Sequence, residues 1–265
     1  MNSSSSDDRY AIRSVDRALD IIECIAGRND ALTVDQITEA TGLPKSTVFR
    51  VLATLAARQF VDRDPQKQTY RLGMLALVVG ARALGDLDIH RVARPHIERL
   101  MAESGETVHL AVLSQASALC IDKIDSTRSV RMSSFVGFRD PLHCSGVGKT
   151  LLAFQDDTAQ QALVADMALE PRTPHTITDK TELLEQLRVI RLQGFATDVE
   201  EIEEGLCCIA APIRDYSGAA VAGVSISGPT TRVHADTFAG LIPLVIACAD
   251  AISRDLGFQG ELKTP

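Results

Sequence analysis

The feature that most constrains this chain is the residue pattern from Thr33 to Arg58, which predicts two short helices joined by a tight turn. In the second helix the apolar residues recur at spacings of three and four and form one stripe for burial: Val48, Val51, Leu52 and Leu55. The opposite face is left with Lys45, Ser46, Arg50 and Thr54. A rigid helix that presents hydroxyl donors and cations suits the major groove of DNA. The sequence therefore predicts a DNA-binding helix-turn-helix.

The flanking residues extend this motif into a small domain. Ser14 to Ala26 predicts a preceding helix, and Thr33 with Gln36 matches a capping box at the start of the second helix. Gly42 supplies the turn, and Pro44 suits the first position of the third helix. The alternative is a small helical bundle that packs against a partner protein, because a solvated face is the usual location of Lys and Arg.

A hairpin follows the helices. Short β-like pieces around Phe60-Val61 and Tyr70–Leu72 are joined by the turn sequence DPQKQ, which behind a helix-turn-helix predicts a wing. Lys67 and Arg71 would then approach phosphates or the minor groove. The predicted DNA contacts are Thr33, Lys45, Ser46, Thr47, Arg50, Lys67 and Arg71.

Charge supports this assignment once it is divided along the chain. The whole chain has a net charge of −8, yet Gly42–Leu72 holds six basic and two acidic residues. Because the Debye length is about 8–10 Å in physiological salt, the local positive charge decides the contact with DNA.

The segment Gly73–Leu87 is apolar on nearly every side and predicts a dimerisation helix covered by its copy in a second subunit. The alternative is a core helix of the second domain.

The remaining residues predict an α+β domain with a mainly antiparallel sheet flanked by helices. The expected strands are Val108–Leu113, Leu119–Ile124, Val130–Phe135, Leu206–Ile213 and Ala219–Ser227. The expected helices are Ile89–Ser104, Gly148–Gln155, Thr158–Ala168, Thr178–Gln193 with Thr178 as its cap, and Asp236–Leu256.

Three segments of this domain are candidates for binding a small anion. Cys144–Thr150 (CSGVGKT) opens a helix with glycines, so free N–H groups favour an anion, but His143 stands where a nucleotide-binding phosphate loop needs glycine. Ser225 and Ser227 lie two apart on a strand and face the same side. In the third segment, Asp198–Cys208, the acidic run is typical of a solvated surface, and Asp198 and Cys208 are placed where a loop closes over a site.

Over nearly its full length the chain resembles the isocitrate lyase regulator (IclR) family of bacterial transcription factors. The resemblance rests on SVDRALDIIE (Ser14–Glu23), GLPKSTVFRVLATL (Gly42–Leu55), YRLG (Tyr70–Gly73), HCSGVGKTLLA (His143–Ala153), GF…D…EE…GLCCIAAPI (Gly194–Ile213) and SISGP (Ser225–Pro229). It implies a winged helix-turn-helix, a dimerising linker helix and a GAF-like effector domain. It also implies dimers or pairs of dimers on palindromic operators, and small organic acids as effectors.

By position, the resemblance places the effector contacts on Gly146, Val147, Asp198, Cys208, Ser225 and Ser227. Val147 stands where a smaller Ala is frequent in the family, which implies a narrower or reshaped pocket. Cys207 points to the opposite strand face from Cys208, so only Cys208 is expected at the site.

The sequence thus predicts a regulator that binds double-stranded operator DNA and a small carboxylate-containing metabolite, and that controls catabolic genes. The expected divisions are residues 1–9 as a disordered tail, 10–72 as the DNA-binding domain, 73–88 as the linker and 89–262 as the effector domain. No cofactor or metal is expected, and a polar start and six unpatterned cysteines favour the cytoplasm, with no membrane contact.

Two other classes remain open at this point. An enzyme would use Cys208 as nucleophile with Asp198 and His143, or a metal held by Cys144, Cys208 and His143. A pure protein-interaction adaptor would need no DNA contact. Turnover of a bound acid distinguishes the enzyme, and unchanged DNA affinity in Arg50→Ala distinguishes the adaptor.

Overall fold

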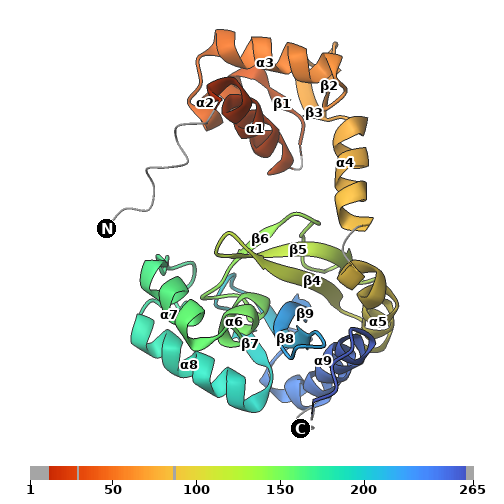
Figure 1. Cartoon of the computed structure of the whole chain (residues 1–265), viewed down its shortest axis with the longest axis vertical. Coiled ribbons are helices and arrows are strands. Elements are labelled where there is room, and N and C mark those ends of the chain that lie inside the picture. The colour runs from red at the N-terminus through yellow and green to blue at the C-terminus, as the bar shows by residue number, and fades with distance from the viewer. Residues whose placement is uncertain (1–11, 29, 86–87, 261–265) are drawn as a thin grey trace. The chain divides into compact units, whose positions relative to one another are not determined.

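The computed structural model describes residues 12–28, 30–85 and 88–260 (Figure 1). The chain forms two compact units that divide between residues 86 and 87. The predicted tail, residues 1–9, lies outside the described residues.

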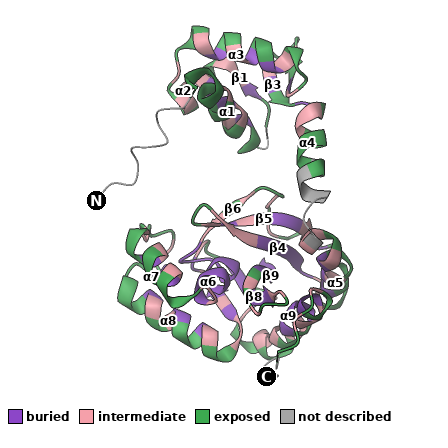
Figure 2. Cartoon of the chain, in the orientation of Figure 1, coloured by how far each residue is buried: buried purple, intermediate pink, exposed green. Residues whose placement is uncertain are grey.

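The first unit is a winged helix-turn-helix followed by a helix. Its elements are α1 (Arg13–Ala26), β1 (Leu32–Thr33), α2 (Val34–Thr41), α3 (Lys45–Ala57), β2 (Val61–Asp64), β3 (Thr69–Leu72) and α4 (Met74–Gly85). The three strands form an antiparallel sheet in the order β1-β3-β2. The stripe predicted on α3 faces the core: Val48, Leu52 and Leu55 are buried together with Ile21 and Ile37 (Figure 2). The predicted fold of this unit is confirmed.

Local signals set the helix ends. Thr33 and Gln36 form the predicted capping box, and Gly42 ends α2 in the left-handed conformation with φ 66°. The prediction for Pro44 is wrong by one residue, because α3 begins at Lys45. Pro44 has an extended ψ of 137°, and its carbonyl accepts from the N–H groups of Thr47 and Val48. That is the role of an N-cap residue.

The second unit is built on one six-stranded sheet in the order β6-β5-β4-β9-β8-β7, in which every neighbouring pair is antiparallel. Its strands are β4 (Thr107–Ser114), β5 (Ser117–Ile124), β6 (Arg139–Pro141), β7 (Ala196–Val199), β8 (Leu206–Arg214) and β9 (Ala220–Pro229). This confirms the predicted α+β class with a mainly antiparallel sheet.

Helices cover both faces of this sheet. On one face lie α6 (Gly146–Ala153), α7 (Asp157–Asp166) and α8 (Lys180–Gln193), with every residue of α6 buried (Figures 1 and 2). On the other face α5 (Asp88–Ser104) packs beside α9 (Ala235–Asp255). By length and composition alone α9 could cross a membrane. Its buried residues, which include Val245, Ala249 and Ile252, lie in its C-terminal half and pack toward β8 and α5.

Two predictions about single elements of this unit are wrong, and one further strand was missed. Val130–Phe135 is not a strand; the edge strand that pairs with β5 is β6. The segment is anchored by side chains instead, because Lys123 donates to the Ser134 carbonyl at 2.7 Å. Helix α8 is capped by Asp179, which accepts from two N–H groups, so Thr178 is not its cap. Strand β7 was not predicted, because its four residues include an aspartate.

Candidate functional site

Helix α3 presents its polar face from the first unit. Ser46 and Arg50 are exposed, and Thr47 is half-buried. Lys45 forms an exposed ion pair with Asp35 at 2.5 Å, whereas the Arg50 guanidinium has no such partner among the residues described. Among the residues described, Arg50 is therefore the cation of this face without an ion-pair partner.

A hollow runs along each side of α3. A hollow of about 430 Å³ toward α1 is lined by Ser14, Arg17, Ala18, Thr47, Arg50, Val51, Thr54 and Leu55. A wider hollow of about 690 Å³ toward the wing is lined by Thr33, Val34, Asp35, Lys45, Ser46, Phe49, Arg50, Arg63, Gln68 and Tyr70. Arg50 lines both, so it stands on the ridge between them. The structure thus brings five of the seven predicted DNA contacts around these two hollows.

The other two predicted contacts lie on the wing. Lys67 is exposed in the turn between β2 and β3, and Arg71 pairs with Asp62 across the two strands at 3.7 Å. Asp64 holds the turn by accepting from the N–H group of Lys67 at 3.1 Å. The sequence prediction omitted Arg63, although its position in the basic segment was a signal for it. Its guanidinium donates to Gln68 beside the wider hollow.

In the second unit the predicted effector residues lie on one face of the sheet. Asp198, Cys208 and Ser227 are paired side by side across β7, β8 and β9, and Thr107 of β4 continues the row. Directly paired residues point to the same face of a sheet. A second row on this face joins Ala210, Ser225, His109 and Lys123.

The start of α6 lies on these two rows. A Cβ atom added at Gly146 would be 3.2 Å from the Cβ of Cys208, and one at Gly223 would be 2.9 Å from a methyl of Val147. The N–H groups of Gly146 and Val147 make no hydrogen bond within the described part of the chain. Free N–H groups at a helix start favour an anion. The geometry therefore brings all six predicted effector residues to one place.

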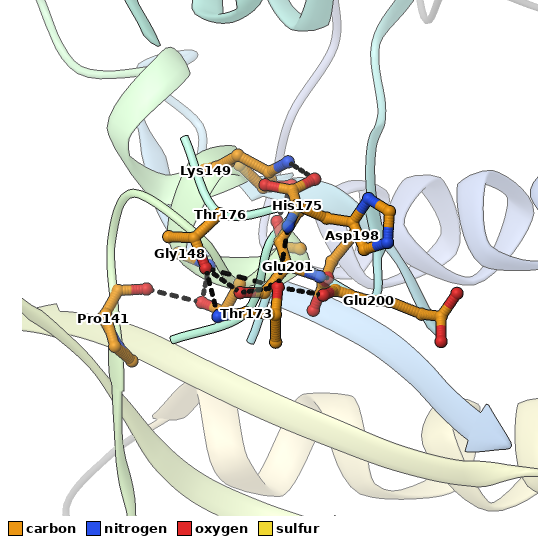
Figure 3. Close-up of polar contacts among 12 residues, drawn as sticks. Pro141, Gly148, Lys149, Thr173, His175, Thr176, Asp198, Glu200 and Glu201 are labelled. Atoms are coloured by element: carbon orange, nitrogen blue, oxygen red, sulfur yellow. Dashed lines mark hydrogen bonds and ion pairs between the residues drawn. The ribbon is translucent and has the colours of Figure 1, made fainter. Parts of the chain in front are cut away.

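A cluster of buried charged and polar residues lies next to this face, between α6 and the loop that follows β7 (Figure 3). The ammonium of Lys149, a fully buried side chain, forms an ion pair with Glu201. The expectation of a solvated acidic run is therefore wrong for Glu201, which is 7% exposed. Thr173 and Thr176 each donate at 2.6 Å to a backbone carbonyl of Glu200 or Glu201 and hold the loop.

Asp198 supplies a carboxyl group to the first of these rows, opposite Cys208. It is fully buried, and its Oδ1 accepts from the N–H group of Glu201 at 2.8 Å. Its Oδ2 has no hydrogen-bond partner among the residues described. Burial raises the pKa of Asp198 to about 7, against the lowering effect of that hydrogen bond. Asp198 therefore supplies either a donor or an acceptor near neutral pH.

This shift has a consequence for stability. Between its usual pKa of 3.8 and about 7, Asp198 holds a proton in the folded protein that it has lost in the unfolded chain. Stability then falls as the pH rises through this window, because the folded state binds more protons. We expect Asp198→Asn to flatten the decline of the unfolding free energy between pH 4 and 7, measured by urea denaturation at several pH values. An unchanged slope would show that Asp198 ionises normally.

The hydroxyl and thiol groups of the site differ in their hydrogen bonding. The Cys208 thiol donates to the Ser227 hydroxyl at 3.0 Å, and burial raises the pKa of Cys208 well above its usual value. The Ser225 hydroxyl has no hydrogen-bond partner in the described structure. His143, which would be the base in the alternative enzyme site, bonds to the carbonyl of Glu170 at 3.1 Å. Burial thus disfavours the thiolate, which is the nucleophilic form of a cysteine.

The sequence prediction missed two polar residues in the row of Ser225, which are His109 and Lys123. His109 is buried and bonds to the hydroxyl of Ser134 at 2.7 Å, and burial lowers its pKa to about 4. Lys123 reaches Asp125 at 2.7 Å. The spacing of Thr107 and His109 along one strand was the only sequence signal that could have located them. Within the described ranges, no group of three or more His, Cys, Asp or Glu side chains is arranged to hold a metal ion.

Comparison with protein families gives two matches. The IclR helix-turn-helix domain matches residues 14–65, and the bacterial transcriptional regulator IclR C-terminal domain matches residues 81–254. The HTH-type transcriptional regulator BhcR of Paracoccus denitrificans is 38% identical over 248 residues, which cover 94% of this chain and 88% of BhcR.

Solved structures give the same result. The IclR of Thermotoga maritima superposes with a TM-score of 0.76 at 30% identity, covering 94% of this chain and all of that one. An IclR homologue of Microbacterium hydrocarbonoxydans, crystallised with 4-hydroxybenzoate, superposes with a TM-score of 0.80 at 26% identity. The match covers 92% of this chain and 98% of that one.

Proposed function

Because the chain belongs to the IclR family of DNA-binding transcriptional regulators, we propose that it binds operator DNA through α3 and the wing under the control of a small organic acid. The observation that carries this proposal is the pairing of two surfaces in one chain. One is the exposed polar face of α3, and the other is the enclosed row of polar groups at the start of α6.

The DNA contacts follow from the position of each group. Ser46 and Arg50 lie in the first two turns of α3, where a recognition helix contacts base edges. Arg50 is the candidate for a bidentate contact to guanine, and Lys67 and Arg71 on the wing are candidates for phosphates. Thr33, Lys45 and Thr47 line the hollows beside the helix and complete the contact surface.

A second copy of the chain is proposed to cover α4. Met74, Leu77, Val78 and Val79 on this helix are each more than half exposed. Exposed apolar groups of this size on one helix favour burial in an interface. A dimer, alone or as a pair of dimers, places two α3 helices on symmetric half-sites of a palindromic operator in the cytoplasm.

The ligand site is proposed at the start of α6. A carboxylate there accepts from the N–H groups of Gly146 and Val147 and from the Ser225 and Ser227 hydroxyls, with Asp198 at the edge. The Microbacterium homologue binds the aromatic acid 4-hydroxybenzoate, which supports a small organic acid as the ligand class. Val147 contacts the sheet over Gly223 and limits the room beside the carboxylate. This size limit favours a short acid, such as an intermediate of a catabolic pathway.

Coupling between the DNA site and the acid site requires only that the acid binds two geometries of the dimer with different affinities. An acid that binds one dimer geometry more tightly shifts the population toward it and changes the separation of the two α3 helices. The operator affinity then changes by at most the ratio of the two acid affinities. In this proposal the acid binds reversibly and is released unchanged.

Removing the two hydroxyls tests the ligand site. We expect Ser225→Ala with Ser227→Ala to raise about 30-fold the concentration at which an active acid changes the DNA affinity, because each buried hydroxyl contributes about 1 kcal/mol to binding. Ligand-free DNA affinity is expected to stay within twofold of the parent. Fluorescence anisotropy with labelled operator and a panel of organic acids, 4-hydroxybenzoate included, measures both quantities.

Ser217→Ala, in an exposed turn of the same unit, is the matched control and keeps the full response. A double variant that responds to the acid like the parent protein would remove Ser225 and Ser227 from the site.

A further inference from the structure

One aromatic side chain stands among the polar groups of α3. Phe49 is 54% exposed, lies three residues after Ser46 and directly before Arg50, and lines the wider hollow with both. The buried residues Val48 and Leu52 face the core from the same helix, and Phe49 is not among the described side chains that pack against that core. Phe49 therefore belongs to the outward face of α3 and contributes little to the core.

The surroundings of Phe49 are positively charged and open. Arg50 and Arg63 line the same hollow and are exposed, whereas Lys45 at the start of the helix is paired with Asp35. Single exposed apolar residues are common on protein surfaces and need no partner of their own. Phe49 differs in its location, because the side chains around it are the ones proposed to bring α3 against DNA.

The major groove offers few apolar groups to such a side chain. Its floor consists of hydrogen-bond donors and acceptors, and the C5 methyl group of thymine is the apolar exception. Phe49 lies in the second turn of α3, within the N-terminal part of a recognition helix that contacts base edges. The side chains of Ser46 and Arg50 can donate hydrogen bonds to polar base edges or phosphates, and the side chain of Phe49 cannot.

We propose that Phe49 is a specificity-determining residue that contacts the methyl group of one thymine in each operator half-site. This inference rests on the proposed function, because it requires α3 to enter the major groove. It adds that each operator half-site contains a thymine beside the base pair that Arg50 contacts. The preference at that position is for the methyl group itself and not for hydrogen-bonding atoms.

Replacing thymine by uracil tests this directly, because uracil lacks only the methyl group. The full-length protein is first footprinted on its own upstream DNA to locate the operator, and each thymine is then replaced in turn by deoxyuridine. We expect one replacement per half-site to weaken binding about fourfold, the factor that corresponds to one buried methyl group. In Phe49→Ala the same replacement is expected to have no effect on the dissociation constant.

Two further variants sharpen the comparison. Phe49→Leu keeps an apolar contact and is expected to retain part of the thymine preference. Tyr216→Ala removes an exposed aromatic residue (80%) of the second unit and is expected to retain all of it. Circular dichroism confirms that each variant is folded.

The possible results separate the two proposals. If uracil weakens binding equally in the parent and in Phe49→Ala at every position, or at no position in the parent, the thymine contact is wrong while DNA binding stands. If neither protein prefers any DNA, the proposed function fails and the thymine contact fails with it.

Discussion

Glu201→Gln is expected to lower the free energy of unfolding of the second unit by about 3 kcal/mol, the low end of the range for breaking a buried ion pair. The variant keeps the shape of the side chain but leaves the buried ammonium of Lys149 without its partner. Asp198 lies close enough to attract that ammonium, which places the loss at the low end. Urea denaturation followed by circular dichroism measures the change.

Two comparisons isolate the cause. Glu185→Gln breaks an exposed ion pair with Arg188, so its effect is expected to stay below about 1 kcal/mol. Lys149→Met combined with Glu201→Leu removes both charges, and buried ion pairs are often replaced by apolar residues at little cost. This double variant is expected to recover most of the loss. Equal stability of Glu201→Gln and the parent would mean that Lys149 is solvated or neutral in the native protein.

Arg50→Ala is expected to weaken operator binding by about 1–3 kcal/mol per half-site and to relax the sequence preference at one base pair. The guanidinium stands free on the ridge between the two hollows of α3, so it is available for a bidentate contact. Alanine is a strong helix former at this exposed position, so the fold is retained. Anisotropy titrations with the operator and with single-base variants measure both effects.

Arg188→Ala, which also removes an exposed arginine from a helix, is the matched control and keeps the affinity of the parent. A protein-interaction adaptor would show the opposite pattern. Its DNA affinity, if any, would be the same with and without Arg50, and the assignment of α3 as a recognition helix would then be wrong.

The N-terminal unit was largely predictable because its signals are local. The capping box of Thr33, the left-handed Gly42 and the stripe of Val48 and Leu52 each depend on neighbours within a few residues. The exception is Pro44, which a one-residue shift converts from first helical residue to cap. Local patterns fix element type more firmly than element ends.

In the second unit, the contacts between residues far apart in the sequence were not predictable from local patterns. Lys149 reads as part of a glycine-rich loop, and Glu201 as part of an acidic surface run 52 residues away. Their burial as a pair depends on α6 being enclosed on every side, which only the tertiary fold determines. The placement of His109 and Lys123 beside Ser225 likewise depends on the register of β4, β5 and β9.

The resemblance to a family, and not periodicity, selected the six effector residues. The structure shows that α6, β7, β8 and β9 bring those residues together, through the close approach at Gly146 and Gly223. Which of them touch a ligand stays a prediction, tested by the serine variants.

The measurement that tests the central claim most directly is a titration of the full-length protein against DNA from its own upstream intergenic region, with and without organic acids. The account predicts saturable binding that exceeds binding to random DNA and changes when one acid is added. Binding is also expected to weaken as the salt concentration rises, because the bound protein displaces cations from the DNA phosphates. Binding to upstream and random DNA with equal affinity, in the presence and absence of every acid, would contradict it.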